Sequence, residues 1–320
     1  MILIGVQDIG PTRYLLALDS YLKETVWVPS AINQNLLAGK NIHQNWESLN
    51  PDIILTGTSL GPSHEKEMIK FGKERNVSTV SIIDHWSWFH KRFEIDGEAH
   101  WPDHIVVNDQ HAKLAAINEG IPEAKIFIGG NPQLELLAHT KLNSVDKFVW
   151  SEDQQVDCNR VILFITEELR SSFAPDTEDY LGYDEFVVLE SIINLKSADD
   201  LLLIKPHPEE ELTKYDAYLC QEVVLAEDWS IDMMVKIPDY VIGMASILLL
   251  ELSLFRSDVI SYRPNAKKGF IGEDIGATHS ASDHSQMSRY LQQKPELGTL
   301  SFRKKYDGSG DRIAHFLGKL

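Results

Sequence analysis

The sequence predicts two consecutive α/β domains, each built around a parallel β-sheet. Short apolar runs alternate with helix-length amphipathic stretches in both halves, as in βαβ units. This periodicity is lost in a polar stretch between about residues 136 and 159. A chain of 320 residues also exceeds the length at which one hydrophobic core usually stops growing, roughly 250–300 residues. One large α/β domain is the alternative.

In the first half, the apolar runs are separated by turn residues such as Gly57, Gly61 and Asn76. Segments of helical length, such as Glu65–Arg75 and Gln110–Glu119, lie between the runs. The expected strands are Ile2–Val6, Thr25–Val28, Asp52–Leu55, Val80–Ile83, His104–Val107 and Ile126–Ile128. We therefore expect residues 1–145 to form an N-terminal domain.

The same alternation of apolar runs and helix-length segments resumes in the second half, so we expect residues 146–320 to form a second domain that includes a terminal helix. The expected strands are Val161–Ile165, Leu201–Ile204, Val223–Leu225, Tyr240–Ile242 and Val259–Tyr262. The expected helices are Asp184–Leu195, Ile231–Lys236, Ser246–Phe255 and Asp311–Leu320. Open parallel sheets bind ligands at the carboxyl ends of their strands. Loops that follow strands, and a cleft between the two domains, are thus the expected places for an active site.

Composition narrows the partners and the compartment. A net charge of −18 and a pI near 5.0 argue against a nucleic-acid polymer as ligand, because binding to one depends on clustered Lys and Arg. A single phosphorylated ligand remains compatible with this charge.

Cys158 and Cys220 are too few for a disulfide framework, which favours a reducing compartment. The first residues have the pattern of a strand rather than an export signal, and no apolar run is long enough to span a bilayer. We expect a cytoplasmic protein, with peripheral attachment to the inner membrane as an option.

The segment Ile204–Glu210, IKPHPEE, is the first candidate site. The two prolines around His207 stiffen the loop and hold the imidazole in a fixed direction. Such a histidine can donate to a phosphate oxygen and stabilise the charge on a departing nucleotide, and Lys205 can add positive charge. A rigid surface turn is the alternative.

The second candidate is Pro238–Phe255, in which a strand ends at Gly243 and a helix opens near Ser246. Free backbone N–H groups and a hydroxyl at such a turn suit a phosphate. In the alternative interpretation, Ser246 is an ordinary N-cap. Glu251 lies on a very apolar stretch, where a buried or ribose-binding carboxylate is plausible.

The N-terminal half contains SIIDHWSWFHKRFE directly after a strand. Asp84 is the predicted general base, since a strand-end carboxylate facing a cleft can take a proton from a hydroxyl. His85 competes for that role. Trp86 and Trp88 can stack on sugars or pack in the core.

Further residues follow strands and are expected to line a ligand site. These are Asp8 and Gly10 in the first loop, Thr58 in TGTS, Arg92 in the segment above, and Thr166 and Glu168 in TEELR. No P-loop, GxGxxG, HExxH or GxSxG motif is present, and we expect no metal site.

Two longer segments resemble known families. PDHIVVNDQHAKLAAINEGIPEAKIFIGGNP is similar to the segment that closes the N-terminal domain of UDP-N-acetylglucosamine 2-epimerases and their transferase relatives. KPHP followed by GMASILLLE resembles the C-terminal domain of CDP-glycerol glycerophosphotransferase-like proteins and of bacterial sialyltransferases and polysialyltransferases. Together these segments resemble the glycosyltransferase-B superfamily, which implies two Rossmann-like domains that face each other across a cleft.

The resemblance implies an inverting, metal-independent glycosyltransferase with no cofactor. Its donor would be a CMP-activated nonulosonic acid or Kdo, and its acceptor a glycan or a lipid-linked glycan of a surface polysaccharide. Asp84 or His85 would activate the acceptor, and His207 would stabilise the departing CMP. The nucleotide side would comprise Lys205, Pro208, Ser246, Glu251, Thr166 and Glu168. The acceptor side would comprise Asp8, Gly10, Thr58, Trp86 and Arg92.

Two other functions stay open. A UDP-N-acetylglucosamine 2-epimerase-like enzyme would eliminate and re-add UDP, although the first loop reads GVQDIGP and lacks the usual glycine-threonine-arginine signature. A noncatalytic nucleotide-sugar-binding protein is the third reading. A homo-oligomer is possible in each case.

Overall fold

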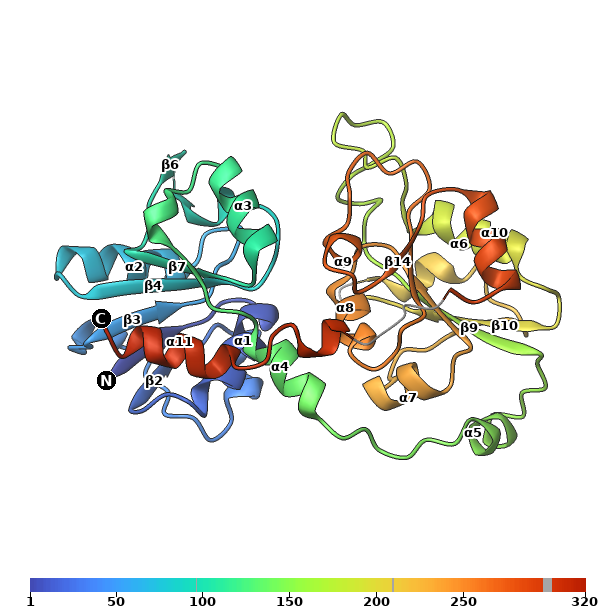
Figure 1. Ribbon diagram of the computed structural model, residues 1–320, viewed down its shortest axis with the longest axis horizontal. Helices are drawn as coiled ribbons and strands as arrows, with labels where there is room; N and C mark the ends of the chain where they lie inside the picture. The colour runs from blue at the N-terminus through green and yellow to red at the C-terminus, as the bar shows by residue number, and fades with distance from the viewer. Residues whose placement is uncertain (96, 209, 296–300) are drawn as a thin grey trace. The chain divides into compact units, whose positions relative to one another are not determined.

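The computed structural model describes residues 1–95, 97–208, 210–295 and 301–320, and the chain divides into two units (Figure 1). Unit 1 comprises Met1–His139 and Tyr306–Leu320, and unit 2 comprises Thr140–Lys305. Each unit is built on a six-stranded sheet in which all pairings are parallel. The predicted fold class, two Rossmann-like α/β domains, is confirmed.

The sheet of unit 1 has the strand order β2-β1-β3-β4-β7-β8. Its strands are β1 Ile2–Gly5, β2 Thr25–Val28, β3 Ile53–Thr56, β4 Ser78–Ile83, β7 His104–Val107 and β8 Ile126–Ile128. Its helices are α1 Ile9–Asp19, α2 His64–Glu74, α3 Gln110–Asn118, α4 Pro132–His139 and α11 Ser309–Leu317. A short antiparallel pair, β5 Glu94–Ile95 and β6 Glu98–Ala99, lies outside this sheet.

Both faces of this sheet are covered, which explains why its strands are continuous apolar runs. Because successive side chains point to opposite faces, Ile4 and Leu3 belong to different cores. One core contains Ile4 together with residues of α1 and α11, and the other contains Leu3 together with Met68 of α2.

The last segment of the chain belongs to unit 1, whereas the sequence division placed residues 306–320 in the second domain. Ile313 of α11 is fully buried against the first sheet, and Figure 1 shows α11 beside α1. The Tyr306 hydroxyl donates to Asp109 Oδ2 at 3.1 Å. These contacts join residues almost two hundred positions apart, which no local pattern reveals. The boundary lies at His139 rather than near residue 145, because α4 packs against α1.

The sheet of unit 2 has the strand order β11-β10-β9-β12-β13-β14. Its strands are β9 Arg160–Ile165, β10 Asp200–Lys205, β11 Val223–Leu225, β12 Tyr240–Gly243, β13 Val259–Tyr262 and β14 His279–Ala281. Its helices are α5 Lys147–Asp153, α6 Glu185–Leu195, α7 Ile231–Lys236, α8 Ile247–Ser253, α9 Ile271–Asp274 and α10 His284–Gln292. Across the described ranges, none of the helices has the length and apolar character to cross a bilayer.

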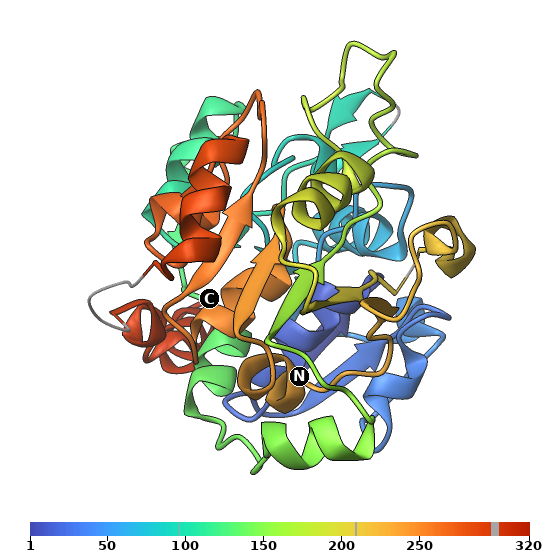
Figure 2. The same ribbon diagram turned by 90° about the vertical axis from the view of Figure 1, so that its right-hand side faces the viewer.

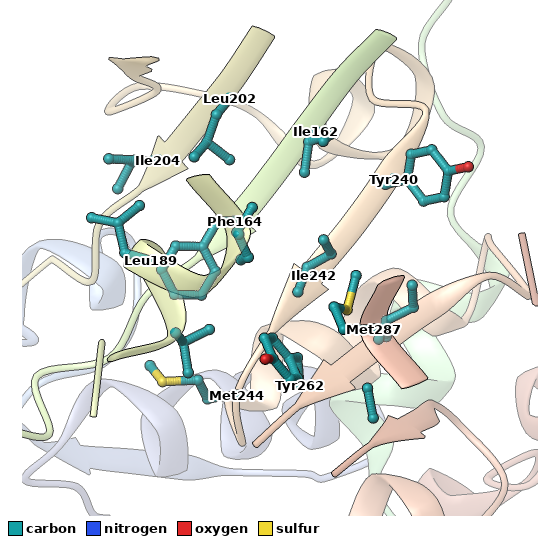
Figure 3. Close-up of a cluster of buried hydrophobic side chains, with 14 of the residues drawn as sticks. Ile162, Phe164, Leu189, Leu202, Ile204, Tyr240, Ile242, Met244, Tyr262 and Met287 are labelled. Atoms are coloured by element: carbon teal, nitrogen blue, oxygen red, sulfur yellow. The ribbon is translucent and has the colours of Figure 1, made fainter. Parts of the chain in front are cut away.

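The main core of unit 2 lies between its sheet and the helices α6 and α10. Figure 3 shows Leu189 of α6 and Met287 of α10 among strand side chains such as Ile162 and Ile242. Figure 2 shows the strands of this sheet with α6 packed across them. Aspartates begin both helices, since Asp184 and Asp283 accept backbone N–H groups of the first turns of α6 and α10.

The strand order of each sheet reverses once along the chain. The chain passes from β1 to β2 on one side and then to β3 on the other, and from β9 to β10 and β11 before it crosses to β12. Loops that leave two such strands diverge, and the crevice between them is where open α/β sheets bind ligands. The loops after β1 and β3, and after β9 and β12, are therefore the first places to examine.

We expect Ile313→Ala to destabilise unit 1 by about 2–5 kcal/mol, because it empties a buried position between α11 and the sheet. The matched control is Asp311→Ala on the exposed side of the same helix. Hydrogen exchange measured by mass spectrometry should show faster exchange in β1 and β3 for Ile313→Ala only. Unchanged exchange in these strands would contradict the role of α11 in this core.

Candidate functional site

A pocket of about 460 Å³ opens at the strand-order reversal of unit 1. Loops after β1, β3 and β4 line it. It brings together six of the residues predicted from the sequence, namely Asp8, Gly10, Thr58, Asp84, His85 and Arg92. These six residues, which come from three loops that follow strands, thus line one continuous pocket in this unit.

Asp84 follows β4 and lies against the start of α1. A Cβ atom on Gly10 would be 2.5 Å from Asp84 Oδ2, so only glycine leaves room for this carboxylate. Burial raises the pKa of Asp84 above its ordinary value, Asp8 adds to this effect, and Arg92 opposes it. Asp84 can therefore hold a proton at a higher pH than an exposed aspartate.

His85 and Arg92 give the pocket its other polar groups. Burial, with the neighbouring Arg92 charge, lowers the pKa of His85 to about 4, so the imidazole is neutral at pH 7. Its Nδ1 is 2.9 Å from Ser87 Oγ. Arg92 donates from Nη1 to the Thr58 carbonyl at 2.9 Å and from Nε to the Ser87 carbonyl at 3.3 Å. Arg92 thereby ties together two of the loops that line the pocket.

The two tryptophans of this segment do not line the pocket. Trp86 is buried, and its indole N–H donates to Asp109 Oδ1 at 3.1 Å, so it belongs to the core of unit 1. Trp88 is exposed and has a φ of 61°, and Lys91 Nζ lies 5.4 Å from the centre of its ring. Core packing, the alternative considered for such residues, explains Trp86.

Glu65 is an important residue of this site that the sequence analysis missed. It is buried, and Oε1 accepts the Gln7 N–H at 3.0 Å while Oε2 accepts the Ser59 hydroxyl at 2.8 Å. Gln7 and Ser59 both line the pocket. One signal was available, because Glu65 falls in helical register with the buried Met68 and Gly72 on the apolar side of α2.

In unit 2, the predicted residues gather at the ends of three neighbouring strands. Lys205 ends β10 and is half-buried, which lowers its pKa, and its Nζ donates to the Pro206 carbonyl at 3.2 Å. His207 and Pro208 are exposed in the loop that follows. Residue 209 of this segment lies outside the described residues.

The loop that carries His207 is held by Glu210, a second residue that the sequence analysis missed. Glu210 Oε2 accepts the His207 N–H at 2.7 Å and the Thr166 hydroxyl at 2.5 Å. Its Oε1 accepts from Tyr215 at 3.1 Å and from Lys214 at 3.0 Å. The side chain of Thr166 is thus engaged inside the protein, where it links the end of β9 to the His207 loop.

At the end of β12, the Ser246 hydroxyl accepts the Leu248 N–H at 3.3 Å and so caps α8. The preceding N–H, that of Ala245, donates to Glu167 Oε2 at 2.6 Å. Burial raises the pKa of Glu167 to about 7. Glu168 and Glu251 are half-buried. A glutamate therefore bridges the two diverging loops in unit 2, as Glu65 does in unit 1.

In the part of the chain that the structure describes, no three His, Cys, Asp or Glu side chains are grouped as metal ligands. Each edge offers carboxylate, imidazole and cationic side chains, among them Asp8, Asp84, His85 and Arg92 in unit 1, and Glu167, His207 and Lys205 in unit 2.

No protein-family model matches this sequence, and no curated protein matches it. Solved structures match along the whole chain. UDP-GlcNAc 2-epimerase from Methanocaldococcus jannaschii has a TM-score of 0.67 and 13% identity, with 100% of both chains covered. S. aureus MnaA with UDP has a TM-score of 0.68 and 11% identity, with 100% of this chain and 97% of that one covered. Anabaena HepE with UDP and glucose has a TM-score of 0.71 and 10% identity, with 100% and 99% covered.

These comparisons show that the chain has the glycosyltransferase-B-like fold of the 2-epimerases. The prediction of a CMP-sugar glycosyltransferase is wrong, because several of the matching structures are of UDP-GlcNAc 2-epimerases, which favour the alternative reading. They do not show a closer likeness to sialyltransferases or CDP-glycerol glycerophosphotransferases. The roles toward a glycan acceptor, assigned to Asp8, Gly10, Thr58, Trp86 and Arg92, fall with that prediction.

Proposed function

We propose that this chain is a UDP-sugar-dependent enzyme of the UDP-N-acetylglucosamine 2-epimerase type. The observation that supports this most strongly is the pocket of unit 1, where the carboxyl groups of Asp8 and Asp84 and the neutral imidazole of His85 lie together. The full-length likeness to epimerases of known structure agrees with it.

The chemistry of epimerisation needs groups of this kind. Inverting C2 of a nucleotide sugar requires that a hydrogen leave C2 and return on the other face, while UDP is eliminated and re-added. Asp84 is the proposed acid-base residue, because its raised pKa lets it accept and release a proton nearer to neutral pH. His85, neutral at pH 7, is the alternative base.

We assign binding of the nucleotide to unit 2. His207 stands exposed on a loop stiffened by two prolines and by Glu210, which suits donation to a diphosphate oxygen. Lys205 adds a nearby positive charge. Thr166 acts through Glu210, and Pro208 shapes the same loop.

Three further residues of unit 2 are proposed to complete the nucleotide site. Ser246 and its turn are placed to face a phosphate, and Glu251 of α8 is proposed to bind the ribose hydroxyls. Glu168, which is half-buried after β9, is proposed to line the same edge.

Incubation with UDP-N-acetylglucosamine should yield the manno epimer, which proton NMR detects by its anomeric signal. In D₂O, deuterium should enter at C2, because the hydrogen that returns comes from solvent-exchangeable groups. Binding of UDP by calorimetry without any turnover would show a noncatalytic binding protein. Absence of both would overturn the proposal.

Asp84→Asn should lower turnover by roughly 10²–10⁴-fold, the usual contribution of a general acid-base group. Its affinity for UDP should stay unchanged, because the nucleotide is assigned to unit 2. The matched control is Asp52→Asn, since Asp52 is exposed and pairs only with the chain's N-terminus among its described neighbours. Gly10→Ala, which pushes on the Asp84 carboxylate, should act in the same direction, whereas Gly269→Ala in unit 2 has open space around its Cβ position and should be silent.

His207→Ala should weaken UDP binding by roughly 10–100-fold, the effect of losing a hydrogen bond to a charged group. The control is His284→Ala, an exposed histidine at the start of α10. Calorimetry with UDP and with CMP measures both the loss of affinity in His207→Ala and the preference of the protein between the two nucleotides. Equal affinity of His207→Ala and the unchanged protein would remove the phosphate role of this loop.

A further inference from the structure

Glu65 joins the two loops that diverge at the strand-order reversal of unit 1. It is only 1% exposed, and its two oxygens accept hydrogen bonds from different loops. Oε1 takes the Gln7 N–H after β1, and Oε2 takes the Ser59 hydroxyl after β3. A Cβ atom on Gly57 would lie 2.6 Å from Oε1, so the close approach of this carboxylate requires glycine there.

No cation is hydrogen-bonded to this carboxylate among its described partners, and the charge of Lys66 acts on it only through space. The neighbouring Lys66 directs its Nζ to the Glu94 carbonyl at 2.9 Å. Asp8, from the loop after β1, is a like charge and disfavours ionisation. Burial is the main cause that raises the pKa of Glu65 to about 7, while the bonds from Ser59 and Gln7 and, as the smallest contribution, the Ser63 hydroxyl act against it. Glu65 therefore changes its protonation state near neutral pH.

The position of the proton is determined by the two partners. Oε1 faces a backbone N–H and must remain an acceptor, so the proton has to reside on Oε2, beside Ser59 Oγ. When Glu65 is ionised, Ser59 donates its only hydroxyl hydrogen to Oε2 and offers the pocket lone pairs alone. When Glu65 is protonated, Oε2–H donates to Ser59 Oγ, and the hydroxyl hydrogen of Ser59 becomes available to a ligand.

We propose that Glu65 is a positioning residue that sets the hydrogen-bonding direction of Ser59, turning it from an acceptor into a donor toward the ligand of the unit 1 pocket when Glu65 takes up a proton. This inference rests on the proposed function, because the ligand is taken to be a UDP-sugar. Protonation favours that ligand in two ways. It supplies a donor for a sugar or acetamido oxygen, and it removes a negative charge from a pocket that already contains Asp8 and Asp84.

Glu65→Gln separates this role from a structural one. The Gln7 N–H still needs an acceptor, so the amide oxygen takes the place of Oε1, and the amide NH₂ then donates to Ser59 Oγ. The variant therefore keeps both contacts and fixes Ser59 in the state that protonated Glu65 produces. Thermal unfolding near pH 8 checks the fold, and the variant should be at least as stable as the unchanged protein, because a buried charge has been removed.

The test is the pH dependence of kcat/KM with UDP-N-acetylglucosamine. In the unchanged protein, kcat/KM should fall by roughly tenfold between about pH 6 and pH 8, as one group with a pKa about 7 loses its proton. Glu65→Gln should remain at the acidic value throughout that range. Ser59→Ala should lose the dependence and stay low. Glu74→Gln, at the exposed end of the same helix, is the matched control and should follow the unchanged protein.

The outcomes distinguish the two proposals. An equal fall in Glu65→Gln would place the ionisation on another group such as Asp84 and would overturn the inference, as would a flat profile in the unchanged protein. If no UDP-sugar is turned over, the proposed function fails, and NMR titration of the Gln7 amide decides about Glu65. If the Gln7 amide signal shifts with a midpoint near pH 7, and Glu65→Gln abolishes this shift, the proposed role of Glu65 is supported. If the signal does not shift, that role is overturned.

Discussion

The reversal of strand order beside β1 and β9 is the constraint on which both candidate sites depend. In a parallel sheet every strand ends at the same edge, but only at a reversal do two neighbouring loops leave toward opposite sides. In unit 1 this brings the first loop, with Asp8, next to the loop that carries Thr58. In unit 2 it brings Glu167 next to the turn before α8.

A diverging pair of loops needs something to hold it, and both units use a glutamate. Glu65 accepts from Gln7 and Ser59, and Glu167 accepts from Ala245. Burial raises the pKa of each glutamate to about 7. Placing a carboxyl group there costs free energy when it is ionised, but it satisfies N–H groups that would otherwise lack partners at the mouth of a site. The same physical arrangement appears on two sheets with no repeated sequence motif.

The fold was largely predictable because parallel strands buried on both faces are recognisable as apolar runs. β14 was missed because His279–Ala281 is short and polar, and α11 was assigned to the wrong part of the chain because its partners lie far away in sequence. In the candidate site, Asp8 and Asp84 were predicted because open parallel sheets bind ligands at the carboxyl ends of their strands. Glu210 and Glu167 were not predicted, because what distinguishes them is their hydrogen bonds to loops that follow other strands.

The prediction of function failed for a related reason. Short segments such as the His207 loop and the Ser246 turn suggest that this edge of the sheet suits a phosphate group. Phosphate groups are common to all nucleotides. They contain no information about the base or the sugar, so a likeness in those segments could not separate a CMP-sugar transferase from a UDP-sugar epimerase. The likeness of the entire chain to solved 2-epimerase structures, which no short motif encodes, favours the second of these readings.

The return of residues 306–320 to unit 1 has a consequence for how the protein is made. A ribosome completes all of unit 2 before it synthesises α11, so the apolar core around Ile4 and Leu55 stays partly exposed, with α1 in place but its last helix missing. Nascent chains with such bare apolar surface are prone to aggregate and are typical clients of chaperones. Unit 2 can therefore complete its core before unit 1 does, and unit 1 should stay dependent on assistance until α11 has been synthesised.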